Sequence, residues 1–489
     1  MKRKLLLLIL SLLLIPCATT ILLDSAFFFI QRIWKPIYQT YIEDGHKFYI
    51  YALGESTALG VHYGEKSAPA RLVSNQFNDS LQGKPIQIIS LAESGQTIEF
   101  NYFKYYFETL FRPHHNALVV IYSGINENIE NSPDPTFLYW QWIQRSTSLS
   151  KMAYMLNVFE NSPQKYEYRY QQIVYRAKQL EHKTIISQLV GNVRDFDPDV
   201  YKYDTLLSPI FKPLLDSVNF YAEKEQWKTE ETFLNKLQNS MPTKHPYLNF
   251  RLGQNKLNQS QPDSASLYLL NITEHNKYLG FASWKNKILE RVAQQKDVAL
   301  AKTFDKFMAV SNQQLVGYNL VDDAHHPNLK GYSIMSQAIA EKVAVLTGEP
   351  IKKRCTPEQI SERLAVDSCW TSVRLHNLVE WYMYEILKTE FPNDRLNRMK
   401  YYLEQYKALN PNDDKQLLWE MFVAIFEQNN INFNKTVSSI NSSPRKKELI
   451  ERMNWAFADE ERKQIITDKA KQLKMDNPNV QSTYALFFK

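Results

Sequence analysis

Two short segments far apart in the chain carry a serine, a histidine and an aspartate in contexts that favour nucleophilic catalysis. Ser56 follows the apolar run 48–53, where a buried strand would end. Asp323 and His326 form an Asp-x-x-His pair just before an expected helix. A serine hydroxyl is a weak nucleophile at neutral pH, so it needs a base within hydrogen-bond distance and a third group that orients this base. The three residues would supply the nucleophile, the base and the orienting carboxylate.

Two further apolar runs lead into residues that can assist the same reaction. The run 85–91 leads to Gly95, and the run 116–122 leads to Asn126. In an open parallel sheet, ligands bind beyond the carboxyl ends of the strands, so Ser56, Gly95 and Asn126 should meet at one edge. A glycine lets the backbone approach a substrate closely. An asparagine amide can donate to a developing oxyanion, which contributes about 3 kcal/mol to catalysis.

These blocks, in this order, resemble the SGNH (GDSL-type) hydrolases, which are esterases and lipases with a flavodoxin-like parallel sheet. The residues that carry the four letters are Ser56, Gly95, Asn126 and His326. The match spans about residues 45–347, with a large departure between 150 and 310. The resemblance therefore implies an α/β fold with a flavodoxin-like parallel sheet and a helical insertion.

The resemblance also implies a role for each residue. Ser56 is the expected nucleophile, His326 the base, and Asp323 the group that orients the base. The backbone amides of Ser56 and Gly95, together with the Asn126 side chain, are the expected oxyanion hole.

Some positions depart from the family pattern or compete with the expected residues. The usual Gly-Asp-Ser and Gly-x-Asn-Asp contain Glu55 and Glu127 here, which keep the charge and lengthen the side chain. Asp322 and His325 form a second pair with the same spacing. The proline that follows His326 favours the first pair over the second.

Structural roles are the alternative for each expected site residue. Ser56 could cap a helix after a strand, Asn126 could be a turn residue, and Asp323 could cap the helix that follows it. Three other histidines have no partner motif, and we interpret them as surface or structural residues: His62, His114 and His115.

Composition sets limits on the class of protein. A chain of 489 residues is too long for one core and suggests two or three domains. The net charge of +6 is spread out, without a basic cluster interleaved with aromatics, so nucleic acid is not an expected partner. The chain has no cysteine–histidine cluster with zinc spacing, no phosphate-cradling glycine loop and no nucleotide fingerprint. No metal and no cofactor are expected.

The N-terminal region predicts a membrane segment. Three basic residues, 2–4, precede the uncharged and mostly apolar stretch 5–23. A helix of this length, at about 1.5 Å per residue, can cross a hydrocarbon core of about 30 Å. Because basic residues stay cytoplasmic, the bulk of the chain should be exported to a periplasmic or other extracytoplasmic location. We favour an uncleaved signal anchor over residues 1–30; a cleaved signal peptide, or a lipoprotein through Cys17, are the alternatives.

A fourth strand is expected at 183–190, and its following loop should also lie near the catalytic edge. Asn192 and Arg194 in this loop are candidate substrate contacts, because arginine can bind a carboxylate or phosphate in a bidentate manner. A pairing of Arg194 with Asp195 that only braces the loop is equally consistent with the sequence.

The region of about 200–310 has the composition of a helical insertion. One hairpin, 247–253 followed by Ala265, resembles a single tetratricopeptide repeat, a combination similar to that in a subset of bacterial SGNH hydrolases. The best candidate for a fifth strand is 314–321, and a helix over 328–346 would close the fold.

Residues 355–489 predict a separate, all-helical domain. Its expected helices are 373–388, 395–409, 417–428 and 445–473. Binding of a protein partner and structural support are both consistent with this domain. Cys355 and Cys369 could close a small loop in an oxidising compartment.

Taken together, these features predict a membrane-anchored, exported serine ester hydrolase. Its location suggests O-acyl or acetyl esters of envelope glycans or lipids as substrates. The sequence is equally compatible with two alternatives: an O-acyltransferase with the same triad, and a catalytically inactive envelope scaffold that binds protein partners.

Overall fold

The computed structural model describes most of the chain beyond its N-terminal region. The described residues are Leu22, 46–127, 129, 136–143, 162–200, 204–241, 245–273, 281–364, 368–456 and 460–473. The predicted membrane segment at 1–30 lies outside them, apart from Leu22. No helix among the described residues combines the length and the apolar character needed to cross a bilayer.

The chain separates into two compact units, and each is built from two stretches of sequence. The first contains residues 1–195 and 260–364, and the second contains 196–259 and 365–489. We expected one helical insertion at about 200–310 and a separate domain at 355–489. In the structure, only the first part of that insertion groups with the C-terminal helices.

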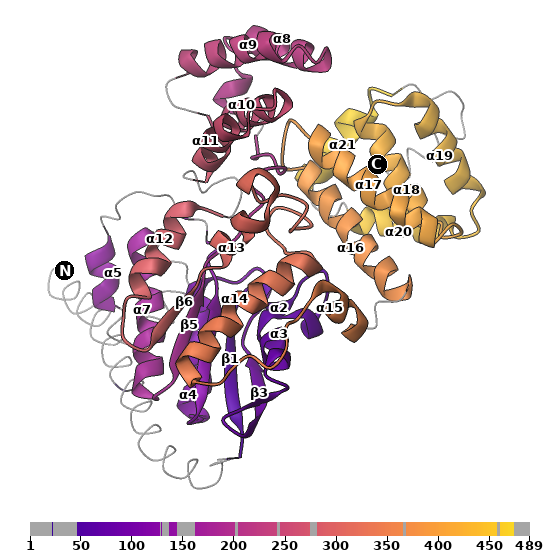
Figure 1. Cartoon of the computed structure of the whole chain (residues 1–489). Helices are drawn as coiled ribbons and strands as arrows, with labels where there is room; N and C mark the ends of the chain where they lie inside the picture. The colour runs from indigo at the N-terminus through magenta and orange to yellow at the C-terminus, as the bar shows by residue number, and fades with distance from the viewer. Residues whose placement is uncertain are drawn as a thin grey trace, which may run out of the picture. The chain divides into compact units, whose positions relative to one another are not determined.

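A six-stranded sheet lies at the centre of the first unit (Figure 1). Its strands are β1 (Phe48–Gly54), β2 (Ser80–Leu81), β3 (Lys84–Ser90), β4 (Ala117–Tyr122), β5 (Lys183–Ser187) and β6 (Val298–Ala301). They follow the order β2-β3-β1-β4-β5-β6, in which only the β2–β3 pair is antiparallel. The fold is therefore α/β with a mostly parallel sheet, and four of the five expected strands are confirmed.

The fifth strand was predicted in the wrong place. It is β6, which is only four residues long and lies at the edge of the sheet. The predicted segment 314–321 is instead a loop with a single bridge, Val321 to Pro327, after the short 3₁₀ turn η3 (Asn312–Gln314). This loop is apolar because Leu315, Val316 and its other large aliphatic residues are fully buried. A buried loop and a buried strand can both be apolar runs in a sequence, so the pattern does not distinguish them.

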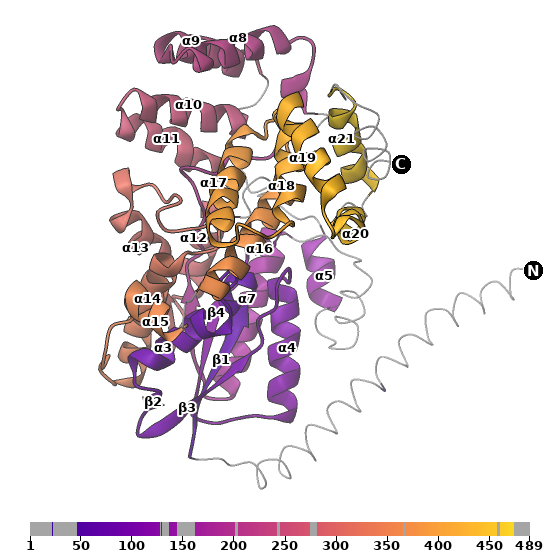
Figure 2. The ribbon, with the colours of Figure 1, turned by 90° about the vertical axis from the view of Figure 1, so that its right-hand side faces the viewer.

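Helices cover both faces of the sheet, as Figures 1 and 2 show. One face carries α3 (Pro69–Gln76) and α14 (Leu329–Thr347), and the other carries α4 (Ile98–Phe111), α7 (Pro163–Gln179) and α12 (Ser283–Val292). Every residue of β1 and β4 is buried, which is why these strands are continuous apolar runs. The helix expected at 328–346 is confirmed as α14, which begins after the capping residue Asn328.

Smaller helices complete the first unit. They are α2 (Ser56–Leu59), η1 (Glu65–Ser67), α5 (Phe137–Ile143), α11 (Pro262–Ile272), α13 (Thr303–Val310) and α15 (Pro357–Arg363). The first of them begins two residues after the end of β1, so the chain turns sharply at this edge of the sheet. A Cβ atom added to Gly54 would lie 2.3 Å from the carbonyl oxygen of Tyr122, so only glycine allows β1 and β4 to approach closely there.

The second unit is helical. Its helices are α8 (Lys212–Glu223), α9 (Trp227–Ser240), α10 (Pro246–Asn258), α16 (Ser368–Ile386), α17 (Asn393–Leu409), α18 (Gln416–Phe426), α19 (Asn430–Ser442), α20 (Lys446–Ala456) and α21 (Glu460–Ala470), with the short turn η2 (Thr205–Leu207). The helices expected at 373–388, 395–409 and 417–428 are confirmed. The segment 445–473 forms two helices, and α19 was not expected as a separate helix.

A buried ion cluster ties the two stretches of the second unit together. The fully buried guanidinium of Arg395 lies 3.0 Å from Asp197, 2.7 Å from Asp199 and 3.7 Å from Glu385.

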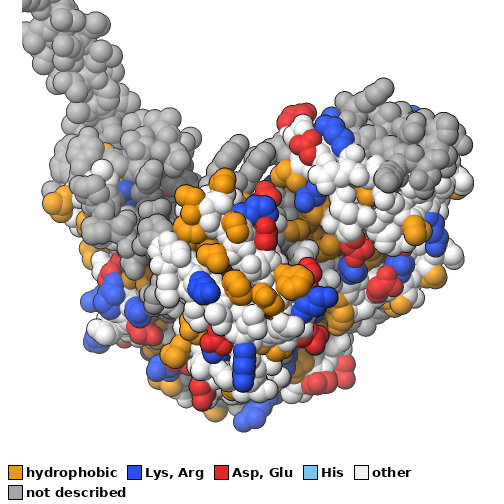
Figure 3. Space-filling view, turned by 90° about the horizontal axis from the view of Figure 1, so that it is seen from above, with side chains coloured by type: hydrophobic (Ala, Val, Ile, Leu, Met, Phe, Trp, Pro, Cys, Tyr) orange, Lys and Arg blue, Asp and Glu red, His pale blue; other side chains and the backbone are white. Residues whose placement is uncertain are grey.

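The repeat-like hairpin that we expected at 247–265 is divided, because α10 belongs to this unit and α11 to the first. On the face shown in Figure 3, basic and acidic side chains of the described residues are interspersed.

Candidate active site

A continuous chain of hydrogen bonds joins the serine, the histidine and the aspartate that the sequence singles out. Ser56 Oγ lies 2.7 Å from Nε2 of His326, and Nδ1 of His326 lies 2.6 Å from Oδ2 of Asp323. A carboxylate can only accept, so the imidazole proton is on Nδ1 and Nε2 accepts from the serine hydroxyl. This is the arrangement in which a histidine removes a proton from serine.

The carboxylate of Asp323 is buried and receives four hydrogen bonds. Its Oδ1 accepts from the backbone N–H groups of His325 at 2.9 Å and His326 at 2.8 Å. Its Oδ2 accepts from the imidazoles of His326 and His62. Burial alone would raise the pKa of this carboxyl, but the charges and hydrogen bonds of His326 and His62 hold the pKa well below its usual range. Asp323 is therefore ionised at neutral pH and can stabilise an imidazolium.

His62 belongs to the site, although the sequence suggested only a surface or structural role. Its Nε2 lies 2.7 Å from Oδ2 of Asp323, and its side chain is 4% exposed. Its ring meets that of His326 edge to face, with centroids 5.0 Å apart. His62 has a backbone φ of 73°, a left-handed conformation that non-glycine residues seldom adopt. No spacing motif links position 62 to position 323, so only the fold reveals this contact.

The competing pair of Asp322 and His325 is not the one that faces Ser56. The carboxylate of Asp322 accepts a hydrogen bond from the hydroxyl of Tyr63 at 2.8 Å. Its backbone N–H donates to the carbonyl of His326 at 2.9 Å. These bonds fix the turn that carries Asp323.

Gly95 and Asn126 lie in the loops that follow β3 and β4, the two neighbours of β1. Gly95 has a φ of 76°, and a Cβ added there would meet no atom within 4 Å, so its backbone borders open space. The side-chain amide of Asn126 donates to the carbonyl of Gln96 at 3.2 Å, which joins the two loops. An amide group carries two N–H donors, so this bond uses one of them.

Glu55, the departure from the family pattern beside the serine, organises the loop after β4. Its carboxylate accepts from the Ser123 hydroxyl at 2.8 Å and from three consecutive backbone N–H groups, those of residues 124–126, at 2.5 to 3.1 Å. Burial raises the pKa of Glu55, while these hydrogen bonds lower it. The side chain therefore positions the backbone of Asn126 relative to Ser56, its own neighbour in the chain.

Glu127 and Lys285 support the same loop from the other side. Glu127 accepts from the backbone N–H of Ile98 at the start of α4, and Lys285 donates to the carbonyls of Gly124 at 2.5 Å and Glu127 at 3.0 Å. Burial and the nearby charge of Glu55 raise the pKa of Glu127 to about 8, and burial lowers the pKa of Lys285 to about 8. Lys285 comes from α12 and could not have been assigned to this loop from the sequence.

The loop after β5 also reaches the site, through the side chain of Asn192. Asn192 is buried; its side-chain amide donates to the Asp323 carbonyl at 3.1 Å, and its side-chain oxygen accepts from the N–H of Asp195 at 2.8 Å. Nε of Arg194 lies 3.5 Å from a carboxylate oxygen of Asp195. These contacts match the bracing alternative for the loop, and substrate contact by Asn192 and Arg194 stays a prediction.

The same histidines could also hold a metal. Within the described part of the chain, His62, Asp323 and His326 form one group whose potential ligand atoms lie within 4.8 Å of one another. Two imidazoles and a carboxylate are a ligand set that zinc accepts. Each of these atoms already takes part in a hydrogen bond between members of the group, and a metal on Nδ1 of His326 would displace the proton that Asp323 holds there.

No protein-family model, no curated protein and no solved structure matches this chain.

Proposed function

We propose that this protein is a serine ester hydrolase of the SGNH type. The observation that carries the proposal is the hydrogen-bonded series from Ser56 through His326 to Asp323, with distances of 2.7 and 2.6 Å, at the carboxyl edge of a parallel sheet. A serine and a histidine that touch in this way, with an ionised carboxylate behind the histidine, are what nucleophilic catalysis needs.

The topology of the sheet supports the proposal. Its five parallel strands follow the order β3-β1-β4-β5-β6, which in chain order of the parallel strands is the 2-1-3-4-5 arrangement of flavodoxin-like sheets. In such sheets the ligand binds where the strand order reverses, which here is between β1 and β4. Ser56 follows β1 and Asn126 follows β4, so both lie at this reversal point.

The mechanism follows from the geometry. His326 accepts the hydroxyl proton of Ser56 on Nε2 as Ser56 Oγ attacks the ester carbonyl carbon. The oxyanion of the tetrahedral intermediate would be bound by the backbone amides of Ser56 and Gly95 and by the Asn126 side chain. Collapse of the intermediate breaks the ester C–O bond, and His326 returns the proton to the leaving alcohol. Water, deprotonated by the same histidine, then releases the acid from the acyl-enzyme and regenerates Ser56.

The substrates we propose are O-acyl or acetyl esters of envelope glycans or lipids. This part of the proposal depends on the basic and apolar N-terminal sequence, which predicts that the protein is anchored in a membrane with its bulk on the outer side. The same acyl-enzyme would serve an O-acyltransferase if an alcohol, in place of water, accepted the acyl group from Ser56.

The test uses the purified full chain with p-nitrophenyl acetate and p-nitrophenyl butyrate, and a fluorophosphonate probe that labels activated serines. We expect hydrolysis and labelling in the wild type, and a loss of at least about 10³-fold in kcat for Ser56→Ala and His326→Ala. Ser217→Ala, which removes a hydroxyl from the helical unit, is the matched control. If the wild type neither hydrolyses the esters nor reacts with the probe, the scaffold alternative replaces this proposal.

A further inference from the structure

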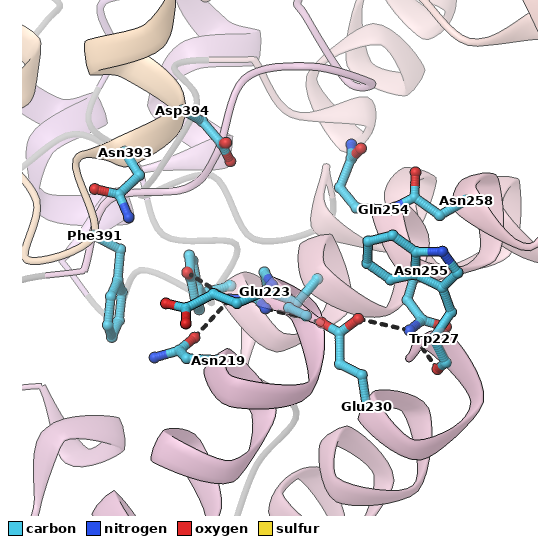
Figure 4. A pocket seen from close by; sticks show the side chains of 13 residues that line it. Asn219, Glu223, Trp227, Glu230, Gln254, Asn255, Asn258, Phe391, Asn393 and Asp394 are labelled. Atoms are coloured by element: carbon cyan, nitrogen blue, oxygen red, sulfur yellow. Dashed lines mark hydrogen bonds and ion pairs between the residues drawn. The ribbon is translucent and has the colours of Figure 1, made fainter. Parts of the chain in front are cut away.

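The helical unit contains a pocket that the proposed hydrolase chemistry does not use. Its volume is about 370 Å³, which falls in the range of small-molecule sites. All residues that line it belong to the second unit: they come from α8, α9, α10, the start of α17 and Phe391 just before it. Figure 4 shows Phe391, Asn393 and Asp394 on one side and Trp227, Gln254 and Asn258 on the other.

The floor of the pocket is a closed polar network. The buried carboxylate of Glu230 accepts from Arg251 at 2.8 Å and from the amide of Asn255 at 2.8 Å. The guanidinium of Arg251 also donates to the side-chain oxygen of Asn219 at 3.0 Å and to the hydroxyl of Tyr247 at 3.3 Å. Because these bonds hold the side chains in place, the floor is preorganised, and its one positive and one negative charge cancel.

Aromatic rings line the pocket as well. The rings of Tyr247 and Phe391 are stacked, with centroids 4.6 Å apart and planes within 17°. Trp227 lies across from them at the first position of α9 and is partly exposed. Ala222 is the one aliphatic residue of the lining, so the apolar surface here is almost entirely aromatic.

This lining disfavours two classes of ligand. An acyl chain would need aliphatic walls, which the pocket lacks. A phosphate or a free carboxylate would face Glu223 and Asp394, two exposed carboxylates at the rim, while Arg251 is already paired with Glu230. Like charges at this range disfavour an anion.

Cations and uncharged polyols are both compatible with the lining, and the amides distinguish between them. Five of the lining residues are Asn or Gln; Asn219 and Asn255 are bound within the floor network, whereas Asn258 and Asn393 are exposed, and an amide carries both donors and acceptors. An ammonium or guanidinium group can only donate, so it would leave amide N–H groups without acceptors. A sugar hydroxyl both donates and accepts, and the C–H face of a sugar ring can lie against an aromatic face.

We infer that this pocket of the helical unit binds a short, neutral saccharide. In this arrangement the ring of Trp227 covers one face of a sugar unit. Amides such as Asn258 and Asn393 bind its hydroxyls at the rim. The inference is independent of the proposed hydrolysis, because no residue of the pocket belongs to the catalytic site.

The experiment is isothermal titration calorimetry of the full chain with cellotetraose, maltotetraose, xylotetraose and chitotetraose. Trp227→Ala and Asn258→Ala change one aromatic and one amide of the lining, and the second is at an exposed position where the fold is not at risk. Phe220→Ala is the matched control, since this aromatic residue of α8 is 54% exposed and is not part of the lining.

We expect at least one tetrasaccharide to bind with a dissociation constant in the millimolar range or tighter. Trp227→Ala and Asn258→Ala should each weaken binding by about tenfold or more, while Phe220→Ala leaves it unchanged. Ser56→Ala should bind as the wild type does, so a failure of the proposed hydrolysis and a failure of this inference can be told apart. The inference is overturned if no saccharide binds, if both lining variants bind normally, or if tetralysine binds and the saccharides do not.

Discussion

Replacement of His62 tests whether a second histidine on Asp323 contributes to catalysis. His62→Phe keeps an aromatic ring in the buried position but removes the N–H that reaches Oδ2 of Asp323 at 2.7 Å. His62→Gln keeps a donor at a similar distance from the backbone. The two variants therefore separate loss of the hydrogen bond from loss of the imidazole.

The size of the effect follows from the four hydrogen bonds on the Asp323 carboxylate. Removal of one leaves three, and a hydrogen bond to a charged group contributes about 1.5–3 kcal/mol. If the lost bond lets the carboxylate leave its position behind Nδ1, so that this energy no longer orients His326 toward Ser56, kcat falls by about 10- to 150-fold, since about 1.4 kcal/mol corresponds to a factor of ten. Asp323→Asn should cost more, on the order of 10⁴-fold, because it removes the charge and disturbs the histidine tautomer.

The assay is steady-state hydrolysis of p-nitrophenyl acetate by the full chain. We expect His62→Phe to lower kcat with little change in KM, because His62 does not face Ser56 but acts through Asp323. His62→Gln should retain most of the wild-type kcat, because it keeps a donor for Asp323. Unfolding in urea provides the control for stability, since a variant that is merely less stable keeps the activity of its folded fraction.

Two results would refute this reasoning. Wild-type kcat in His62→Phe would mean that the fourth hydrogen bond on Asp323 does not reach the transition state. A larger loss in His62→Gln than in His62→Phe, with unfolding unchanged, would mean that ring packing against His326 matters and the donor does not.

Three further predictions concern buried ionisable side chains. Burial lowers the pKa of His182 from 6.5 to about 4, so between these pH values the unfolded chain binds a proton that the folded chain does not. The free energy of unfolding should therefore fall by about 3 kcal/mol as the pH drops from 6.5 to 4. His182→Phe should abolish this pH dependence, measured by urea titrations. Arg395→Met leaves three carboxylates without their cation and should destabilise the helical unit by about 3–5 kcal/mol, measured by chemical denaturation, and by less at acidic pH where these carboxylates become protonated. Glu55→Gln places an amide N–H against backbone donors of the 124–126 loop and should lower the free energy of unfolding by about 3 kcal/mol and reduce ester hydrolysis, whereas Ser217→Ala should change neither.

Local sequence was enough to locate most of the sheet and the helix that closes the fold. The runs that became β1, β4 and β5 are almost entirely buried, and the run that became β3 is partly buried, mainly at alternating positions; strands of these two kinds are apolar along their whole length or on alternating positions. The apolar loop at 314–321 was misread because it is equally buried. The short β6 was missed because four residues at the edge of a sheet carry little pattern.

The division into units was beyond the reach of the sequence. Residues 196–259 and 365–489 are separated by more than a hundred positions, and they are joined by contacts such as those of Arg395 with Asp197 and Asp199. A charged residue in a helical sequence normally predicts a solvent-exposed face, and nothing local marks Arg395 as buried.

The sequence alone was enough to single out Ser56, His326 and Asp323, from their residue types, their spacing and the strands before them. The residues that surround these three could be identified only in the folded chain. His62 donates to Asp323, Glu55 binds the loop of Asn126, and Lys285 supports that loop from a distant helix. This difference arises because a nucleophile and its base recur in recognisable local sequence patterns. A buried hydrogen bond needs only a donor and an acceptor in the same place, and any two positions of the chain can supply them.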